Sequence, residues 1–241
     1  MGEIKKIIKS SNVLYSVAYN CLKIISKIIS DEKYIRIKYK FKFGKELDLD
    51  NPKTFNEKIQ WRILKDRKDI YTQLADKYLV RDYVKEKIGE EYLIKLLGVY
   101  ERAEDIDYDK LPNKFVLKCN HDSGSVILCE DKLTFDRKEA NKKLNFFLKR
   151  NFYFQTREWH YRNIKPLIIC EEFLEETGKV VDDYKVYIFN KKNQKSLSFI
   201  QIEEDRFENH RRGIYTENWE LLPVKRILEH LKKGVKPKNW N

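Results

Sequence analysis

The chain has 241 residues, with 50 lysines and arginines against 38 aspartates and glutamates, and therefore a formal net charge of +12 at pH 7. A chain of this length forms one large domain or two small lobes, and its basic surplus favours an anionic partner such as a nucleotide, an anionic lipid or an acidic polysaccharide. The basic residues are spread along the chain and form no single block, which argues against nucleic acid as the partner. A lysine-rich genome would produce the same surplus without any such partner.

The N-terminal region, residues 1–45, is expected to contain an amphipathic helix. Apolar residues recur at helical spacing between residues 4 and 29, and lysines interrupt them at Lys5, Lys6, Lys9, Lys23 and Lys27. No apolar stretch reaches the roughly 18 residues of a membrane span, and no signal-peptide cleavage site follows. The helix either packs on the domain or on a second copy, which is the favoured interpretation, or lies on an anionic membrane surface.

The next region, residues 46–110, is expected to begin with a capped helix and to end with a strand. Thr54 and Glu57 have the spacing of a capping box, which predicts a helix start at this point. Further along, the apolar residues of 93–99 predict a strand.

A second helix is expected in the same region, from about Ile70 to Ile88, with Gly89 as its stop signal. Lys77 and Arg81 would then share one face, because they are four residues apart. The helical spacing also predicts four inward-facing side chains: Leu74, Tyr78, Val84 and Ile88.

The third region, residues 111–241, is expected to open with a hairpin. An apolar run ends at Lys118, and a second run at residues 126–128 follows a short loop that contains Ser123, Gly124 and Ser125. A loop of this kind can direct backbone N–H groups toward an anion, with Lys118 supplying positive charge. The alternative is a plain hairpin whose lysine is solvated.

The cysteines indicate reduced thiols in a cytoplasmic protein. Cys119, Cys129 and Cys170 fall on predicted strands, where a free cysteine behaves as a small buried apolar residue. No Cys-x-x-Cys pair occurs, so no zinc or other metal site is expected from the cysteines.

Residues 136–161 are expected to form a helix and then an aromatic segment. The helix should run from Asp136 to Arg150, with Leu144 on its inner side. The aromatic residues of 152–161 form either the edge of a core or a platform for a substrate. The core interpretation is favoured, since large aromatic side chains dominate packing energetics.

Six segments together resemble the ATP-grasp superfamily, and within it the teichuronopeptide-biosynthesis, or TupA-like, branch. They are residues 51–61, 76–81, 92–100, 115–125, 167–174 and 183–189. The resemblance spans roughly residues 40–240, and the sequence Asn-Pro-Lys-Thr-Phe-Asn-Glu-Lys is its most specific part. It implies an α+β fold with two lobes, mixed or antiparallel sheets, and a nucleotide between the lobes.

The resemblance also implies the residues that bind the nucleotide. Arg81 matches a phosphate-binding cation of the superfamily, and residues 171–174 match the hinge strand that holds adenine. Glu171 and Glu172 alternate faces on a strand, so only one can look into the cleft. The full expected set is Lys77, Arg81, Lys118, Ser123, Gly124, Ser125, Glu171, Glu172, Phe173, Leu174, Asp183 and Lys185.

The reaction implied by the resemblance is ATP-dependent ligation of a carboxylate to an amine through an acylphosphate. Arg206, His210 and Arg211, together with Arg212, would hold an acidic substrate or the transferring phosphate. The expected role is bacterial cell-surface polysaccharide biosynthesis of the capsule or teichuronopeptide type, with an acidic sugar or polysaccharide precursor and an amino acid as substrates. Two alternatives are a glycosyltransferase-associated protein that uses a nucleotide sugar, and a non-catalytic module that binds anionic polymer or membrane.

Two departures from the family pattern bear on the expected cofactors, ATP and Mg²⁺. The family holds Mg²⁺ with acidic residues after the segment that matches 236–240, whereas this chain ends at Asn241. The C-terminal part is therefore expected to be truncated and the activity feeble, as in a degenerate ligase. Asp122 stands where relatives tend to have glycine, and a carboxylate there repels an anion unless a cation intervenes. The expected location is the cytoplasm, with possible peripheral contact at the inner face of the membrane.

Overall fold

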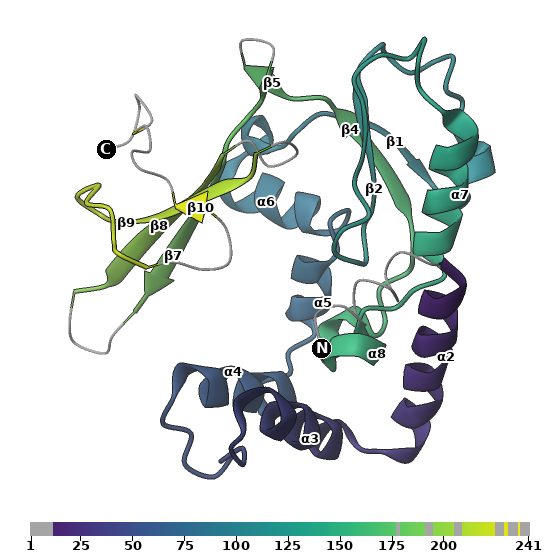
Figure 1. The fold of residues 1–241 in the computed structure, drawn as a ribbon. Coiled ribbons are helices and arrows are strands. Elements are labelled where there is room, and N and C mark those ends of the chain that lie inside the picture. The colour runs from purple at the N-terminus through teal and green to yellow at the C-terminus, as the bar shows by residue number, and fades with distance from the viewer. Residues whose placement is uncertain are drawn as a thin grey trace. The chain divides into compact units, whose positions relative to one another are not determined.

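The computed structural model describes residues 12–176, 179–190, 195–204, 209–224, 229–230 and 236. The chain divides into two compact units, Met1–Phe173 and Leu174–Asn241. The first combines helices with an antiparallel sheet, and the second is built from strands (Figure 1). The expected α+β class is confirmed. The region boundaries expected after residues 45 and 110 both fall inside the first unit.

From residue 12 onward, where the described part of the chain begins, the first unit opens with five α-helices: α2 (Asn12–Ile28), α3 (Asp31–Phe43), α4 (Phe55–Lys65), α5 (Ile70–Ala75) and α6 (Val80–Ile88), followed by the 3-10 turn η1 (Glu90–Tyr92). The expected capping box is present at the start of α4. The Thr54 hydroxyl accepts a hydrogen bond from the Glu57 N–H, and the Glu57 carboxylate accepts one from the Thr54 N–H. Both contacts satisfy N–H groups that the helix itself leaves without partners.

The single helix expected from Ile70 to Ile88 is wrong, because the chain turns between α5 and α6. The Asp76 carboxylate accepts hydrogen bonds from the N–H groups of Tyr78 (2.8 Å) and Leu79 (3.3 Å). Such local contacts from an aspartate compete with the helix for the backbone donors. Lys77 therefore lies in a turn and shares no helix face with Arg81. Leu74 and Ile88, which were expected to face inward, are exposed.

The sheet of the first unit contains β1 (Leu96–Tyr100), β2 (Phe115–Cys119), β3 (Ile127–Cys129) and β4 (Ile168–Glu172) in the order β1-β4-β2-β3, with every pair antiparallel. The hairpin predicted around Lys118 is confirmed as β2 and β3. The helix α7 (Arg137–Leu148), the short helix α8 (Tyr153–Thr156), and the 3-10 turns η2 (Ala103–Asp105) and η3 (Trp159–Tyr161) complete this unit.

The main core of the first unit lies between one face of this sheet and α7, which runs beside it in Figure 1. Phe115, Leu117 and Cys119 are fully buried, while the residues between them are only partly buried. This alternation directs Lys118 to the opposite face of the sheet. Leu144 of α7 is fully buried against the core, as expected, and so are all three strand cysteines: Cys119, Cys129 and Cys170.

The second unit contains a four-stranded sheet in the order β10-β9-β8-β7. Its strands are β7 (Asp183–Phe189), β8 (Leu197–Glu204), β9 (Arg211–Thr216) and β10 (Glu229–His230), and the pair β5 (Glu175–Glu176) and β6 (Lys179–Val180) forms a separate ribbon. β10 is parallel to β9, and the other pairs are antiparallel. Ile200, Ile202 and Tyr215 form the core. Among the described residues of both units, no helix has the length and apolarity of a membrane span.

The packing of α7 on the sheet predicts the cost of removing Leu144. Leu144→Ala should lower the free energy of unfolding by about 2–5 kcal/mol, because it leaves a cavity in a closely packed core. Leu133→Ala is the matched control, since Leu133 is 93% exposed. Urea denaturation followed by circular dichroism measures both. Equal midpoints for the two variants would show that α7 does not cover this core.

Candidate nucleotide site and a second charged cluster

In the first unit, one buried carboxylate joins two cations that were expected to bind phosphate. Glu171 of β4 is buried and forms ion pairs with Lys118 of β2 and with Arg81 of α6, whose Nη1 lies 3.4 Å from Oε1. Arg81 also donates to the carbonyl of Ile94 at 2.7 Å. We call Arg81, Lys118 and Glu171 the hinge cluster. Its net charge is positive, since one carboxylate is shared by two cations.

The strand register explains why these side chains meet. Val116 of β2 pairs with Glu171, so Lys118, two residues further along β2, is the diagonal neighbour of Glu171 on the same face of the sheet. The alternative of a solvated Lys118 is therefore wrong. The register also separates the two glutamates, because Glu171 points to the cations and Glu172 is exposed. Phe173 and Leu174, the remaining expected hinge residues, lie on either side of the boundary between the units.

Lys77 holds the loop after β2 in place. Its ammonium donates to the carbonyl of Cys119 at 3.2 Å, to that of Asn120 at 3.3 Å, and to that of Asp122. An ammonium has three donors, so all three are used on the loop backbone. Burial lowers the pKa of Lys77, an effect that the nearby Asp122 carboxylate opposes. In this structure Lys77 shapes the phosphate-loop candidate and does not point to open solvent.

Asp122 is turned into the protein, away from the loop surface. Its carboxylate accepts a hydrogen bond from the Ser125 hydroxyl and lies 3.9 Å from the Arg150 guanidinium. The Ser125 oxygen in turn accepts from the Cys119 N–H at 3.0 Å. Arg150 is thus the intervening cation that the sequence argument required. The repulsion of an anion by Asp122 is correspondingly reduced.

Ser123 and Gly124 form the exposed tip of this loop. Gly124 has φ of 96°, a backbone conformation that favours glycine, and a Cβ atom placed on it would meet no atom within 4 Å. The tip is therefore open. Successive N–H groups in a turn with a positive φ can form an anion-binding concavity. Ser125 is buried, and its hydroxyl forms hydrogen bonds inside the loop.

Sequence reasoning missed the polar core beneath the loop. Asn120 is fully buried; its amide donates to Asp76 at 2.9 Å and to the carbonyl of Lys165 at 3.0 Å, and it accepts from the Leu167 N–H at 2.7 Å. Burial lowers the pKa of its neighbour His121, whose ring is also buried. The motif Asp-Lys at residues 76–77 was noticed only for its lysine. Three separate segments must fold together before these partners meet.

The second unit holds a separate group of charged residues around Glu203 of β8, which we call the β8 cluster. The Glu203 carboxylate, only 3% exposed, contacts His210, the Arg212 guanidinium at 2.8 Å, and the Lys185 ammonium at 3.2 Å. Lys185 also pairs with Asp183 at 2.9 Å. Asp183 and Glu203 are direct partners across β7 and β8. Although burial raises the pKa of Glu203, hydrogen bonds from Lys185 and His210 lower it to about 2.

The structure divides the expected catalytic residues. His210 joins the β8 cluster, and so does Arg212, whereas Arg211 pairs with Glu204 at 3.2 Å. Neighbouring residues of β9 point to opposite faces, so Arg211 and Arg212 cannot serve the same site. Arg206 lies outside the described residues.

Three carboxylates of the second unit, Asp183, Glu203 and Glu204, do not fit as ligands of Mg²⁺ in this arrangement. Mg²⁺ requires carboxylate oxygens that are free to enter its coordination shell. Asp183 and Glu203 share Lys185, and Glu204 is paired with Arg211. Within the described ranges, no group of three or more His, Cys, Asp or Glu side chains could hold a metal ion.

The combination of helices with largely antiparallel sheets agrees with an ATP-grasp-like fold. The family model described as TupA-like ATPgrasp matches residues 57–238. The chain therefore belongs to the TupA-like ATP-grasp family, which generally binds ATP with Mg²⁺. No curated protein and no solved structure matches it significantly.

The lowered pKa of Glu203 predicts acid sensitivity of the second unit. A carboxylate whose pKa falls from 4.5 to about 2 on folding contributes stability above pH 4.5, and this contribution is lost as the pH falls toward 2. Glu203→Gln should therefore flatten the pH dependence of unfolding within this window. The measurement is urea denaturation followed by Trp219 fluorescence, with the other tryptophans replaced by phenylalanine. Glu220→Gln, at an exposed position of the same unit, is the control and should keep the wild-type dependence.

Proposed function

We propose that the chain binds ATP and uses it to join a carboxylate to an amine in bacterial cell-surface polysaccharide biosynthesis. The observation that carries the nucleotide part is the hinge cluster, in which Lys118 and Arg81 are held on one buried carboxylate in a chain of the TupA-like ATP-grasp family. The choice of an acidic sugar or polysaccharide precursor, with an amino acid as the amine, rests on the resemblance to this family.

The hinge cluster suits a triphosphate because its cations are already positioned. Glu171 fixes Lys118 and Arg81 against β4, so less side-chain freedom is lost when a phosphate replaces part of their contact with the carboxylate. Arg81 offers a planar fork of donors and Lys118 a point charge. The open tip at Ser123 and Gly124 would add backbone N–H donors to the same ligand.

The proposed reaction has two steps whose atoms balance. A carboxylate oxygen of the acidic substrate attacks the γ-phosphorus of ATP, and ADP leaves. The amine then attacks the carbonyl carbon of the acylphosphate, and inorganic phosphate leaves. His210, Lys185 and Arg212 would attract an acidic substrate, since three basic side chains surround Glu203.

Binding without turnover is the second candidate. Asp183, Glu203 and Glu204 of the second unit are already paired with cations, as a degenerate ligase would permit. A glycosyltransferase-associated role with a nucleotide sugar would use the same phosphate-binding cations, so the choice of nucleotide is part of the test.

Lys118→Ala should weaken ATP binding by about 1.5–3 kcal/mol, the scale of a hydrogen bond to a charged group. Titration calorimetry with ATP and with a non-hydrolysable analogue measures the change. Lys110→Ala is the matched control, since Lys110 is an exposed lysine of the same unit. Unchanged affinity in Lys118→Ala would remove this loop from the site, and tighter binding of a nucleotide sugar than of ATP would favour the glycosyltransferase-associated role.

Positional isotope exchange in β,γ-labelled ATP distinguishes ligation from binding alone. In the presence of candidate uronic acids, a ligase scrambles the label because the phosphoryl transfer is reversible before the amine reacts. We expect exchange that depends on the uronic acid and that is lost in Lys118→Ala. ATP binding without exchange would identify the chain as a degenerate member of the family.

A further inference from the structure

A cavity of about 490 Å³ lies within the first unit, between the last turns of α2 and the segment that contains α8. It is lined by Lys23, Ser26, Lys27, Tyr153, Phe154 and Arg162. None of these six residues is acidic, and three are cations. The volume is within the range of small-molecule sites and exceeds what a bare phosphate needs. The lining charge favours an anionic ligand, and the volume leaves room for a larger group attached to it.

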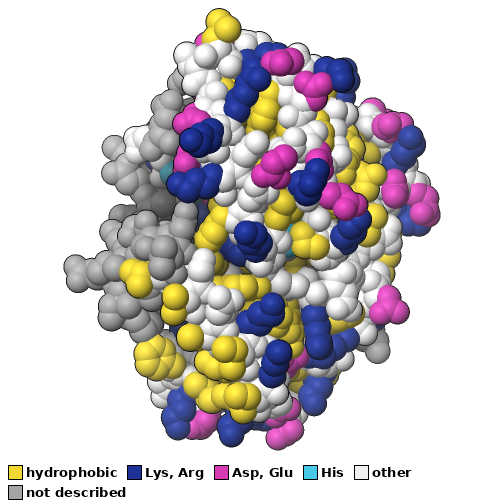
Figure 2. All heavy atoms as spheres, turned by 90° about the vertical axis from the view of Figure 1, so that its right-hand side faces the viewer, with side chains coloured by type: hydrophobic (Ala, Val, Ile, Leu, Met, Phe, Trp, Pro, Cys, Tyr) yellow, Lys and Arg dark blue, Asp and Glu magenta, His cyan; other side chains and the backbone are white. Residues whose placement is uncertain are grey.

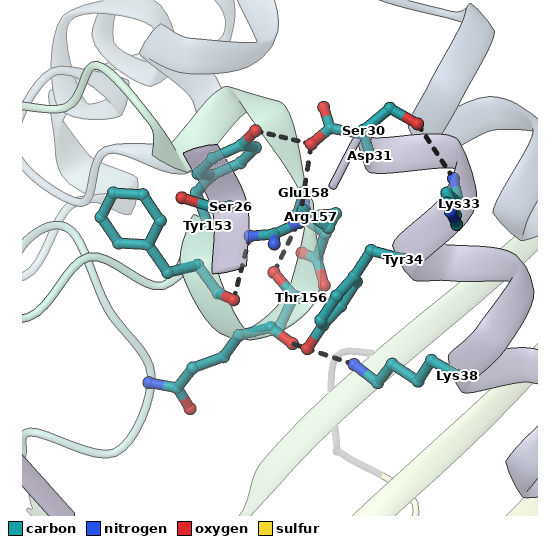
Figure 3. A network of polar contacts seen from close by, with 12 residues as sticks. Ser26, Ser30, Asp31, Lys33, Tyr34, Lys38, Tyr153, Thr156, Arg157 and Glu158 are labelled. Atoms are coloured by element: carbon teal, nitrogen blue, oxygen red, sulfur yellow. Dashed lines mark hydrogen bonds and ion pairs between the residues drawn. The ribbon is translucent and has the colours of Figure 1, made fainter. Parts of the chain in front are cut away.

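The three cations of this cavity have no carboxylate partner in the part of the chain that the structure describes. The nearby acid, Asp31, is already engaged: it accepts from the Tyr153 hydroxyl at 2.6 Å and lies 3.6 Å from the buried Arg157 (Figure 3). It also accepts from Arg67 at 2.9 Å. Its charge is thus compensated by Arg67 and Arg157. The three cations are exposed at the mouth of this open cavity, and without a carboxylate partner they leave a positive potential that an anionic group would neutralise.

The walls of the cavity are held in place by packing. The Tyr19 hydroxyl accepts from the Asn151 N–H at 2.8 Å, and its ring packs edge-on against Phe154. Tyr153 is buried and fixed by Asp31, with the Arg162 guanidinium 5.4 Å from its ring centroid. These contacts of Tyr153 and Phe154 are the ones expected if the aromatic residues of 152–161 form the edge of a core. A site with fixed walls binds with a smaller loss of conformational entropy.

Next to the lysines, α2 exposes an apolar stripe. Val17, Ile24 and Ile28 are 58%, 59% and 79% exposed, and their spacing places them on one side of the helix. Lys23 and Lys27, four residues apart, lie on the adjoining side. Figure 2 shows this face of the molecule, where dark-blue basic side chains lie among yellow apolar ones in the lower half. Apolar and basic residues side by side on an exposed helix are the pattern of a helix that lies on an anionic membrane surface.

We propose that this cavity binds the phosphate group of an anionic membrane lipid, while Val17, Ile24 and Ile28 contact the acyl chains beside it. Lys23, Lys27 and Arg162 supply the charge, and charge complementarity selects an anionic lipid over an apolar protein partner, which would leave the three cations buried without partners. The site is distinct from the hinge cluster, so this inference does not depend on nucleotide binding.

Co-sedimentation of the full chain with phosphatidylcholine vesicles, with and without phosphatidylglycerol, tests the proposal. Removing each cation should lower the partition coefficient on the anionic vesicles about fivefold, so the double variant Lys23→Gln/Lys27→Gln should lose more than Arg162→Gln. The control Lys33→Gln/Lys42→Gln removes equal charge from exposed positions of α3 and should change binding by less than about twofold. Ile24→Ser/Ile28→Ser changes exposed residues only and should also weaken binding to anionic vesicles.

Three outcomes would overturn the proposal. An equal loss in the α3 control would show that binding reports general charge only, and no loss in the cavity variants would remove the site. Glycerol 3-phosphate that binds in the cavity by NMR titration, with no vesicle binding, would identify a soluble phosphate ligand instead. Circular dichroism and ATP calorimetry on every variant separate a folding defect, or a failure of the hinge cluster, from the loss of this site.

Discussion

The contact between the sheet of the first unit and α6 depends on the buried carboxylate of Glu171. A buried carboxylate is tolerated only when cations and hydrogen-bond donors compensate it, and here Lys118 comes from β2 while Arg81 comes from α6. The pairing therefore ties the far face of the sheet to the helix that follows the Asp76 turn. Arg81 reaches further, to the carbonyl of Ile94. The same cations that hold the unit together are those that a nucleotide phosphate would recruit, so binding and packing draw on one set of contacts.

A second consequence concerns the loop after β2. The Lys77 ammonium donates hydrogen bonds to three loop carbonyls. Asn120 forms hydrogen bonds with Asp76 and with the segment that leads into β4. Such a network is costly when incomplete and rigid when every member has a partner. The loop tip at Ser123 and Gly124 is thus presented from a fixed base, which is what a phosphate-binding loop requires. The turn at Asp76, which broke the expected helix, supplies part of that base.

Sequence reasoning succeeded where the determinants are local. The capping box at Thr54, the hairpin around Lys118 and the helix that contains Leu144 follow from spacing within a dozen residues. It failed at Asp76, because a side chain that bonds to its own turn outweighed the helical pattern. It could not place Asp122 or choose between Glu171 and Glu172, since their partners lie on other segments. Buried ion pairs are contacts of the folded chain, and no single segment encodes them.

The ion pairs of the structure show where part of the chain's excess of basic residues is used. In the hinge cluster two cations share one carboxylate, and in the β8 cluster Lys185, His210 and Arg212 converge on Glu203. Lysine-rich composition alone predicts solvated lysines scattered over the surface. It does not predict clusters in which basic side chains outnumber the buried carboxylates that they contact. In such a cluster the fixed positive charge attracts a further anion. The cavity beside α2 continues this pattern, because its cations have neutral walls and no acid among the residues that line it.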